Sequence, residues 1–299
     1  MGIFFSLLSP ALFAVNNYID KVLLSKFNIH PTVVAIYSGF FTVLAGFIVL
    51  FFTGFYPADT KTIAVLLASG FLTGLYLLPY CKGLSLDETS RIVPLFQLTP
   101  VFVLILSFLF LGEKLAFRQY VGSFIIIFAG FLILAEKPSK NIFALRPAFW
   151  YTALSCLMFA LAQVLYKFGV QEIPFWHTLP YESFGIALGA IAILFFPGNV
   201  ILFKKETKRF TKRVYTSMAI NEFVYVMSRY TGYFAISLIS VSIVSVLSGF
   251  QSVFALIYGI ALTLFLPKII KEGISRKTLG VKIFSIAIMF AGLYLIFSL

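Results

Sequence analysis

Two charged residues lie inside an apolar stretch that runs from Ala219 to Ser237. They are Glu222 and Arg229, seven residues apart. A charged side chain at the centre of a bilayer costs roughly 2.5–3.5 kcal/mol on insertion scales, so such residues face a cavity or a partner. A carboxylate and a guanidinium in a cavity wall could bind a polar or zwitterionic solute. The alternative is that each pairs with another helix for structural reasons alone.

The two charges share one face of a predicted helix with other polar side chains. Residues at i, i+3, i+4, i+7 and i+11 fall on the same side of an α-helix. Counted from Glu222, these positions hold Tyr225, Val226, Arg229 and Tyr233. We therefore expect Glu222, Tyr225 and Arg229 to line a substrate site. Glu222 is also a candidate for carrying a coupling proton.

The composition places these residues in a membrane protein. The 299 residues are 61% hydrophobic and only 11% charged, whereas soluble domains are nearer 25% charged. The mean hydropathy is +1.01. The net charge of +12 comes from basic residues in short loops between apolar segments. This distribution favours contact with a membrane surface and membrane lipid over binding to nucleic acid.

Ten apolar segments of the length that a membrane span requires can be marked along the chain. Backbone groups in lipid must pair within their own segment, and these segments do not alternate polar with apolar residues, so helices are predicted rather than barrel strands. The expected fold is all-α, an integral membrane bundle of ten transmembrane helices. The segments are 2–24, 33–54, 62–86, 89–111, 116–135, 147–170, 177–197, 212–238, 240–266 and 278–298.

The sequence also repeats itself, in the same order, over three segments. Each copy then holds five helices, and because five is odd the second copy enters the membrane from the opposite side. The predicted units are residues 1–140 and 141–299, two inverted five-helix repeats, an architecture found in many alternating-access transporters. The overlays are Leu84–Ile105 on Ile236–Ile257 with eight identities, Tyr37–Gly54 on Tyr181–Gly198 with seven, and Ser9–Lys21 on Ser155–Lys167.

Several stretches resemble a known transporter family. Tyr80–Leu115 (YCKGLSLDETSRIVPLFQLTPVFVLILSFLFLGEKL) resembles the third-to-fourth helix signature of EamA-type transporters, which belong to the drug/metabolite transporter superfamily. Gln119–Leu134 resembles their fifth helix, and Phe290–Ile296 its second copy. The resemblance implies ten helices around a central cavity and secondary transport of small solutes. Gly112-Glu113-Lys114 fits the family's Gly-Glu, and Leu266–Lys277 stands where a second copy of that motif would be.

Polar residues in other segments are further candidates for binding substrate. Asn17 is mirrored by Gln163 in the repeat, as expected for a site between two related halves. The resemblance implies that Gln97 and Gln251 border the central cavity, and Tyr80 lies near the end of the third helix. Each of these side chains could equally seal a contact between helices by hydrogen bonding.

Glu182 and Asp20, the other acidic residues considered in apolar segments, each allow a functional and a structural interpretation. Glu182 lies close to the start of segment 177–197, where it could couple transport to protons, bind a substrate amine, or simply reach interfacial water. Asn16, Asn17 and Asp20 cluster in the first segment. Asp20 could instead form a helix-end pair with Lys21 at the lipid headgroups.

The sequence holds no motif of an enzyme and none for a cofactor or metal. Its two histidines, His30 and His177, are not in metal-ligand spacing, and neither a Walker loop nor a dinucleotide-binding fingerprint is present. We therefore expect a secondary transporter in the cell membrane that moves a small polar or amphipathic metabolite, such as an amino acid, by alternating access. The alternatives are a flippase or carrier of sugar conjugates or lipid-linked sugars, a channel, and a non-transporting membrane scaffold.

The basic residues also bear on orientation. If the segments alternate in direction, the loops on the side of the N-terminus hold few basic residues, and Lys204–Arg213 lies with most of the others on the opposite side. The positive-inside rule then places Lys204–Arg213 in the cytoplasm and both termini outside. The resemblance implies the reverse, because the family usually keeps both termini inside.

Overall fold

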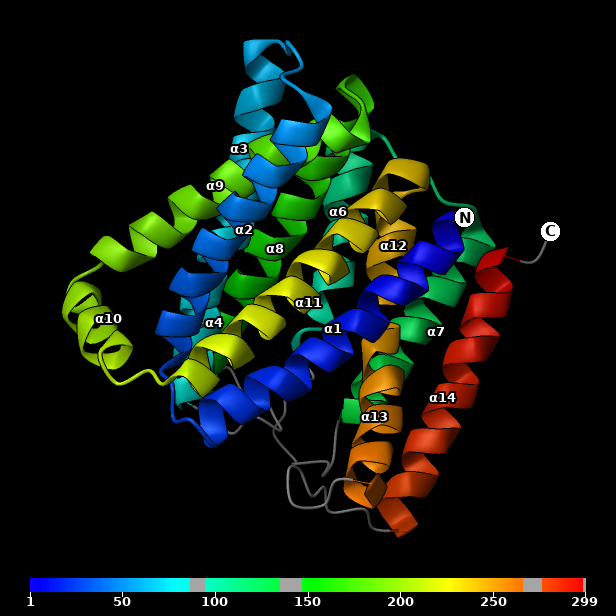
Figure 1. The fold of residues 1–299 in the computed structure, drawn as a ribbon. Coiled ribbons are helices and arrows are strands. Elements are labelled where there is room, and N and C mark those ends of the chain that lie inside the picture. Colours follow the sequence, from blue (N-terminus) through cyan, green and yellow to red (C-terminus); the bar gives the residue numbers. More distant parts are fainter. Residues whose placement is uncertain (87–94, 135–146, 266–275, 298–299) are drawn as a thin grey trace.

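The computed structural model describes residues 1–86, 95–134, 147–265 and 276–297. Within these ranges every regular element is a helix, which confirms the all-α class (Figure 1). The expected boundary at residue 140 lies outside the described residues, as does most of Leu266–Lys277. In chain order the elements are α1 (Gly2–Ser25), α2 (Pro31–Thr53), α3 (Thr60–Leu75), α4 (Leu77–Leu86), α6 (Leu98–Leu111), α7 (Phe117–Leu134), α8 (Pro147–Glu172), α9 (Phe175–Phe195), α10 (Asn199–Thr207), α11 (Lys212–Leu238), α12 (Val241–Leu247), the 3-10 turn η1 (Ser248–Phe250), α13 (Gln251–Phe265) and α14 (Arg276–Phe297).

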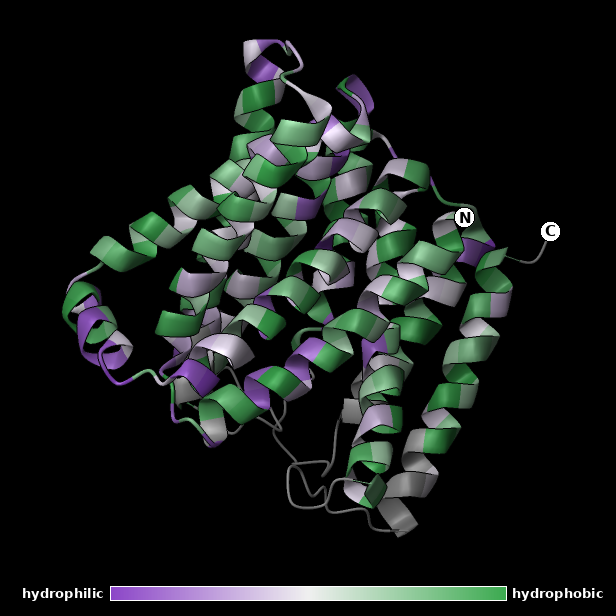
Figure 2. Ribbon diagram, in the orientation of Figure 1, coloured by the Kyte–Doolittle hydropathy of each residue, from purple (hydrophilic) through white to green (hydrophobic). Residues whose placement is uncertain are grey.

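The surface of the bundle is apolar where a lipid bilayer would cover it. Large side chains such as Phe51 and Phe117 are each 84% exposed, which is unusual in a protein surrounded by water. Hydrophilic residues gather on α10 and the adjoining start of α11 (Figure 2). In the described ranges, six helical stretches are long and apolar enough to span a membrane: Gly2–Leu24, Pro31–Thr53, Thr60–Tyr80, Pro147–Glu172, Phe175–Phe195 and Val241–Phe265.

Two segments that were expected to be single helices are interrupted. Segment 62–86 divides at Tyr76 into α3 and α4. Pro79 explains this division, because it has no N–H and its ring clashes with the carbonyl four residues earlier, that of Leu75. Segment 240–266 consists of α12, η1 and α13. Gly249 lies in the middle of this 3-10 turn.

A proline inside a helix deprives the carbonyl four residues earlier of its donor, but Pro100 does not leave the carbonyl of Phe96 free. The backbone N–H of Thr99 donates to the Phe96 carbonyl at 3.0 Å. Pro100 lies in the first turn of α6, where backbone N–H groups have no partner within the helix in any case. Pro100 therefore begins a helix rather than bending one.

Helices from the two ends of the chain interleave. In the closest pairings, α1 packs along α11 and α13, while α8 packs against α3, α4 and α6. In addition, α2 pairs with α9, and α7 pairs with α14 (Figure 1). Each pairing joins an element of the first half to one of the second half. The two halves of the sequence therefore share one core.

Two charged side chains hold the corner between α11 and α12. Lys167 of α8 donates from Nζ to the carbonyls of Ile236, at 2.7 Å, and Ile239, at 2.9 Å, at the end of α11. Glu113, which follows α6, accepts the backbone N–H of Val241 at 3.1 Å at the start of α12. The last carbonyls and the first N–H groups of a helix have no partner within that helix. The positive Lys167 lies at the negative end of the α11 dipole, and the negative Glu113 lies at the positive end of the α12 dipole. The glutamate of the Gly-Glu motif thus joins the two halves.

Glycines bring the backbones of α3 and α9 into contact. A Cβ atom at Gly70 would overlap the carbonyl oxygen of Glu182, and one at Gly185 would overlap that of Leu67. Close approach through small residues is the usual way in which helices associate in lipid, where the hydrophobic effect does not drive them together. This contact fixes the position of Glu182 against the first half of the chain.

Replacing Gly70 by alanine is expected to lower the stability of the purified protein. The atoms that the new methyl group meets belong to the backbone and cannot rotate away, and overpacking of this kind costs about 1–3 kcal/mol. The midpoint of thermal unfolding in detergent measures the effect. Gly280→Ala is the matched control, because a Cβ there would meet no atom of the described residues within 4 Å. Equal unfolding midpoints for the two variants would contradict the prediction.

Candidate functional site

Arg229 occupies the centre of a buried polar cluster between α2, α9 and α11. Its side chain is 4% exposed, and Nη2 lies 3.5 Å from Oε2 of Glu182, which is fully buried. Nη1 donates to the hydroxyl of Thr42, and Nη2 to that of Ser183, both at 3.4 Å. The positive charge is therefore offset by a carboxylate from another helix, and not by the glutamate on its own helix.

Three tyrosine rings surround the same guanidinium. Its Cζ atom lies 5.7 Å from the ring centroid of Tyr225, 5.4 Å from that of Tyr230 and 5.9 Å from that of Tyr233. Aromatic faces attract a cation at these distances. The hydroxyl of Tyr233 also donates to Oε1 of Glu182 at 2.8 Å. Tyr225 and Tyr233 belong to the predicted polar and aromatic face of α11, and Tyr230, which lies outside that predicted face, completes a cage around one charge.

The cage is supported from behind by α8. The ring of Tyr166 stacks on that of Tyr233 with centroids 3.7 Å apart and the planes 13° from parallel. Its hydroxyl is 2.7 Å from that of Thr178 at the start of α9. Because Tyr166 is fully buried, this contact leaves the Tyr233 hydroxyl little freedom to turn away from Glu182.

Some polar atoms of the cluster have no partner within the protein. Among the described residues, Nε of Arg229 and the hydroxyl of Tyr230 are buried without a hydrogen bond. Buried donors of this kind are rare in folded proteins, and each requires an explanation. A carboxylate or other acceptor of a bound solute would satisfy both.

Glu222 belongs to a second polar cluster, about two helical turns before Arg229 on α11. It is 1% exposed, and its Oε1 accepts the hydroxyl of Ser38 on α2 at 2.7 Å. The neighbouring Asn221 donates to Oδ1 of Asp20 on α1 at 2.9 Å. This cluster therefore connects α1, α2 and α11.

The structure separates the two neighbouring asparagines of α1. Asn17, the predicted path residue, is exposed. Asn16 is buried instead and donates to Oδ1 of Asn221 at 2.7 Å. Gln163, the predicted mirror of Asn17, is 8% exposed on α8. Asn16 is thus the residue of the pair that faces the interior.

The other predicted site residues lie around the start of α6. Gln97 is buried against two glycines: a Cβ at Gly130 would lie 2.7 Å from its Cδ, and one at Gly249 would lie 3.3 Å from its Oε1. Tyr80 meets the ring of Phe96 edge-on, with centroids 5.0 Å apart. Gln251, partly buried, begins α13. The neighbours of Gln97 and Tyr80 thus come from elements other than those around Arg229.

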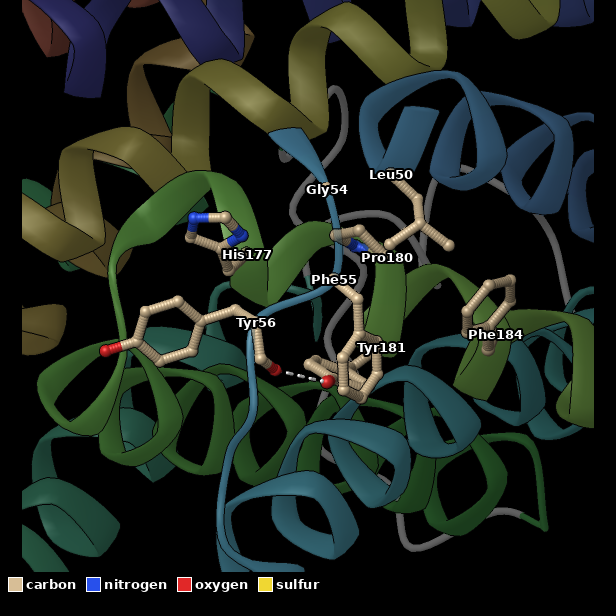
Figure 3. A pocket seen from close by; sticks show the side chains of 8 residues that line it. All are labelled: Leu50, Gly54, Phe55, Tyr56, His177, Pro180, Tyr181 and Phe184. Atoms are coloured by element: carbon tan, nitrogen blue, oxygen red, sulfur yellow. Dashed lines mark hydrogen bonds between the residues drawn. The ribbon is translucent and has the colours of Figure 1, made fainter. Parts of the chain in front are cut away.

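A small apolar cavity of about 100 Å³ lies beside the Arg229 cluster, between the end of α2 and the start of α9. Tyr181 and Phe184 of α9 line it, as does His177, whose ring lies 4.8 Å from that of Tyr56. Figure 3 shows the Tyr181 hydroxyl donating to the Tyr56 carbonyl across this cavity, at 2.9 Å. Tyr181 flanks Glu182 in sequence, so the cavity and the polar cluster occupy different faces of the same helical turns.

Four of the residues in contact with these charges were not among the sequence candidates: Ser38, Thr42, Ser183 and Asn221. Serine and threonine are frequent in membrane helices, so their residue type alone does not single them out. Two signals could have found part of the set. The overlay of Tyr37–Gly54 on Tyr181–Gly198 aligns Ser38 with Glu182, and Asn221 directly precedes Glu222.

Comparison with known proteins gives consistent matches. The EamA-like transporter family matches residues 1–135. An uncharacterized transporter of Sinorhizobium sp. is 41% identical over 75 residues, which are 25% of this chain and 52% of that protein. One of Archaeoglobus fulgidus is 30% identical over 105 residues, 35% of each chain. The chain thus spans about half and about a third of these two relatives. A crystal structure of a protein with 14% sequence identity superposes with a TM-score of 0.72 and covers 99% of this chain and 96% of its own, which shows a shared fold.

A double-mutant cycle between Glu182 and Arg229 is expected to show strong coupling. Glu182→Gln leaves the arginine charge buried without a partner, and breaking a buried pair in this way costs about 3–5 kcal/mol. Glu182→Gln combined with Arg229→Met should therefore be considerably more stable than the sum of the single effects predicts. Unfolding in detergent measures each variant. The cycle of Glu222→Gln with Arg229→Met is the control and should give a smaller coupling, and additive effects at Glu182 would refute the pairing.

Proposed function

We propose that the chain, whose residues 1–135 match the EamA-like transporter family, is a secondary transporter for a small polar or amphipathic metabolite. It is an integral multi-pass membrane protein. The proposal adds that residues 1–140 and 141–299 are two inverted five-helix repeats, and that the solute binds between them. Rocking of the two halves about the bound solute would expose it alternately to the two sides of the membrane.

A hydrogen bond that occurs twice supports the repeat. The hydroxyl of Ser9 on α1 donates to the Ser228 carbonyl on α11 at 2.8 Å, and that of Ser155 on α8 donates to the Tyr76 carbonyl at 2.9 Å. The overlay of Ser9–Lys21 on Ser155–Lys167 aligns the two donors. The register that places Leu84 on Ile236 also aligns Tyr76 with Ser228. The same bond therefore recurs with the two halves exchanged.

A second pair of contacts follows the same relation. Asn16 of α1 donates to the carbonyl of Asn221 on α11 at 3.2 Å. In the other half, Ser69 of α3 donates to the carbonyl of Ala162 on α8 at 2.8 Å. The two alignments used above place Asn16 on Ala162 and Ser69 on Asn221. Exchange of the two halves therefore places one contact on the other. The donor differs: Asn16 donates in the first contact, whereas in the second the donor is Ser69, which aligns with the acceptor Asn221.

The two halves differ in the polar groups that they bring to the centre. The contact of Glu222 with Ser38 corresponds to the contact of Gly70 with Glu182, since the repeat aligns Glu222 with Gly70 and Ser38 with Glu182. One position thus carries a carboxylate in one half and no side chain in the other. The polar groups are therefore gathered where α2 and α9 pack against α11, and we assign solute binding to this region.

The observation that carries the proposal is the caged, incompletely paired Arg229. The Glu182 carboxylate lies 3.5 Å from Nη2 of its guanidinium, and Nε has no hydrogen-bond partner within the part of the chain that the structure describes. A solute carboxylate could displace Glu182 and accept from both Nε and Nη2, a bidentate geometry that arginine favours. Glu182 would then be released to pair with an amine of the solute. The tyrosine rings would pack against the apolar part of the solute. A zwitterion such as an amino acid meets these requirements.

Conversion of Arg229 to lysine tests the proposal. Lysine keeps the charge that Glu182 needs but loses the planar fork, so solute binding should weaken while the fold persists. A thermal-shift screen against amino acids and other carboxylates first identifies a solute, and uptake is then measured in proteoliposomes. We expect Arg229→Lys to reduce uptake at least about tenfold, the equivalent of losing one charge-assisted hydrogen bond.

The matched control is Arg209→Lys, which makes the same change at an exposed residue after α10. Normal uptake by Arg229→Lys would refute Arg229 as the solute ligand. Scrambling of labelled lipid by the wild-type protein would instead support a flippase, and electrical currents far above carrier turnover would support a channel.

A further inference from the structure

One backbone carbonyl fixes the direction of the hydrogen bonds around Asp20 and Glu222. Nδ2 of Asn16 lies 3.2 Å from the carbonyl oxygen of Asn221, and because that oxygen can only accept, Asn16 must present its N–H₂ group there. The same group lies 2.7 Å from Oδ1 of Asn221. The Asn221 side chain therefore presents its oxygen to Asn16 and its own N–H₂ group in the opposite direction.

That N–H₂ group donates to two carboxylates at once. Nδ2 of Asn221 lies 2.9 Å from Oδ1 of Asp20 and 3.5 Å from Oε1 of Glu222. The hydroxyl of Ser38 donates to the same oxygen of Glu222 at 2.7 Å. Neutral donors thus hold acidic side chains from α1 and α11 side by side. Two carboxylates that share a site in this way resist being ionised together.

The buried positive charge on α11 is already paired. Arg229, about two turns along α11, is in contact with Glu182 of α9. Lys21 follows Asp20 on α1. The hydroxyl of Tyr37 on α2 turns to Thr207, 3.4 Å away. Besides the pair itself, the helices α1, α2, α9 and α11 carry these titratable groups: Tyr18, Lys21, Tyr37, His177, Tyr181, Glu182, Lys212, Arg213, Tyr215, Tyr225, Arg229, Tyr230 and Tyr233.

One oxygen of the pair has no donor at all. Glu222 is 1% exposed, and its Oε2 is buried without a hydrogen-bond partner in the described part of the chain. Burial of an ionised oxygen without a donor costs far more than burial of a neutral acid. A proton bound at Oε2 would remove the charge from this unpartnered oxygen.

We propose that Asp20 and Glu222 together form the binding site for the coupling proton, an inference that rests on the transport function proposed above. The proton bonds to Oε2 of Glu222 from one side of the membrane, while Asp20 stays ionised and held by Asn221. It leaves to water when the site opens to the other side. A sodium ion fits less well, because N–H₂ and O–H donors point at the carboxylates where a hard cation requires oxygen ligands.

Infrared spectroscopy of the full-length protein during a pH titration tests the site without any solute. A buried carboxylic acid gives a C=O stretching band that disappears when its proton is lost. We expect this band in the wild-type protein, its loss in Glu222→Gln, and a change in the pH at which it disappears in Asp20→Asn. Glu172→Gln, which alters an exposed glutamate at the end of α8, should leave the band unchanged. A wild-type protein without the band, or a band that survives in Glu222→Gln, would overturn the proposal.

Transport measurements separate this inference from the function on which it rests. In proteoliposomes with an imposed pH gradient, coupling to one proton can concentrate a neutral solute up to about tenfold per pH unit. Glu222→Gln, which removes the group that accepts the proton, should abolish this response. Uptake that ignores the pH gradient would overturn proton coupling while leaving the transporter assignment intact. Thermal stabilisation of the wild-type protein by sodium chloride over choline chloride, absent in Glu222→Gln, would identify a sodium site and also overturn it.

Discussion

The structure depends on keeping the charge of Arg229 buried in a bundle whose outer surface is apolar. This charge is tolerated because Glu182 reaches it from another helix, because the hydroxyls of Thr42 and Ser183 accept hydrogen bonds from it, and because three tyrosine rings face it. Each of these groups comes from α2, α9 or α11. The position of those three helices is therefore constrained by electrostatics as well as by packing.

The backbone contacts explain how that arrangement is held without large apolar side chains at the interface. Gly46 of α2 lies against Ser183, and Gly39 lies against Ala190 of α9. The repeat aligns Gly39 with Ser183 and Gly46 with Ala190, so this pair of contacts is also related by exchange of the halves. The helices that carry the polar groups thus touch along the proposed axis of the repeat. A movement between the halves would act directly on the contact of Arg229 with Thr42 of α2, which joins the second half to the first.

Much of this architecture could be predicted from the sequence, because hydrophobicity and helix periodicity are local properties. The face of α11 that carries Glu222 and Arg229 follows from spacing alone, and the structure buries both. The partner of Arg229 could not be derived in this way, because the distance to Glu182 depends on how α9 and α11 pack. Which of Asn16 and Asn17 faces the interior depends on the rotation of α1 about its axis. Hydrophobic spacing fixes this rotation less finely than the step between two adjacent residues.

The central claim is that the space around Arg229 opens alternately to both sides of the membrane and holds the solute. Ser183, a direct contact of Arg229, can be changed to cysteine in a background without Cys81 and Cys156. The rate of its modification by a membrane-impermeant thiol reagent is then measured from each side of sealed proteoliposomes. The account predicts modification from both sides, slowed by the transported solute. A cysteine that is inert from either side, or that reacts at a rate independent of solute, would contradict it.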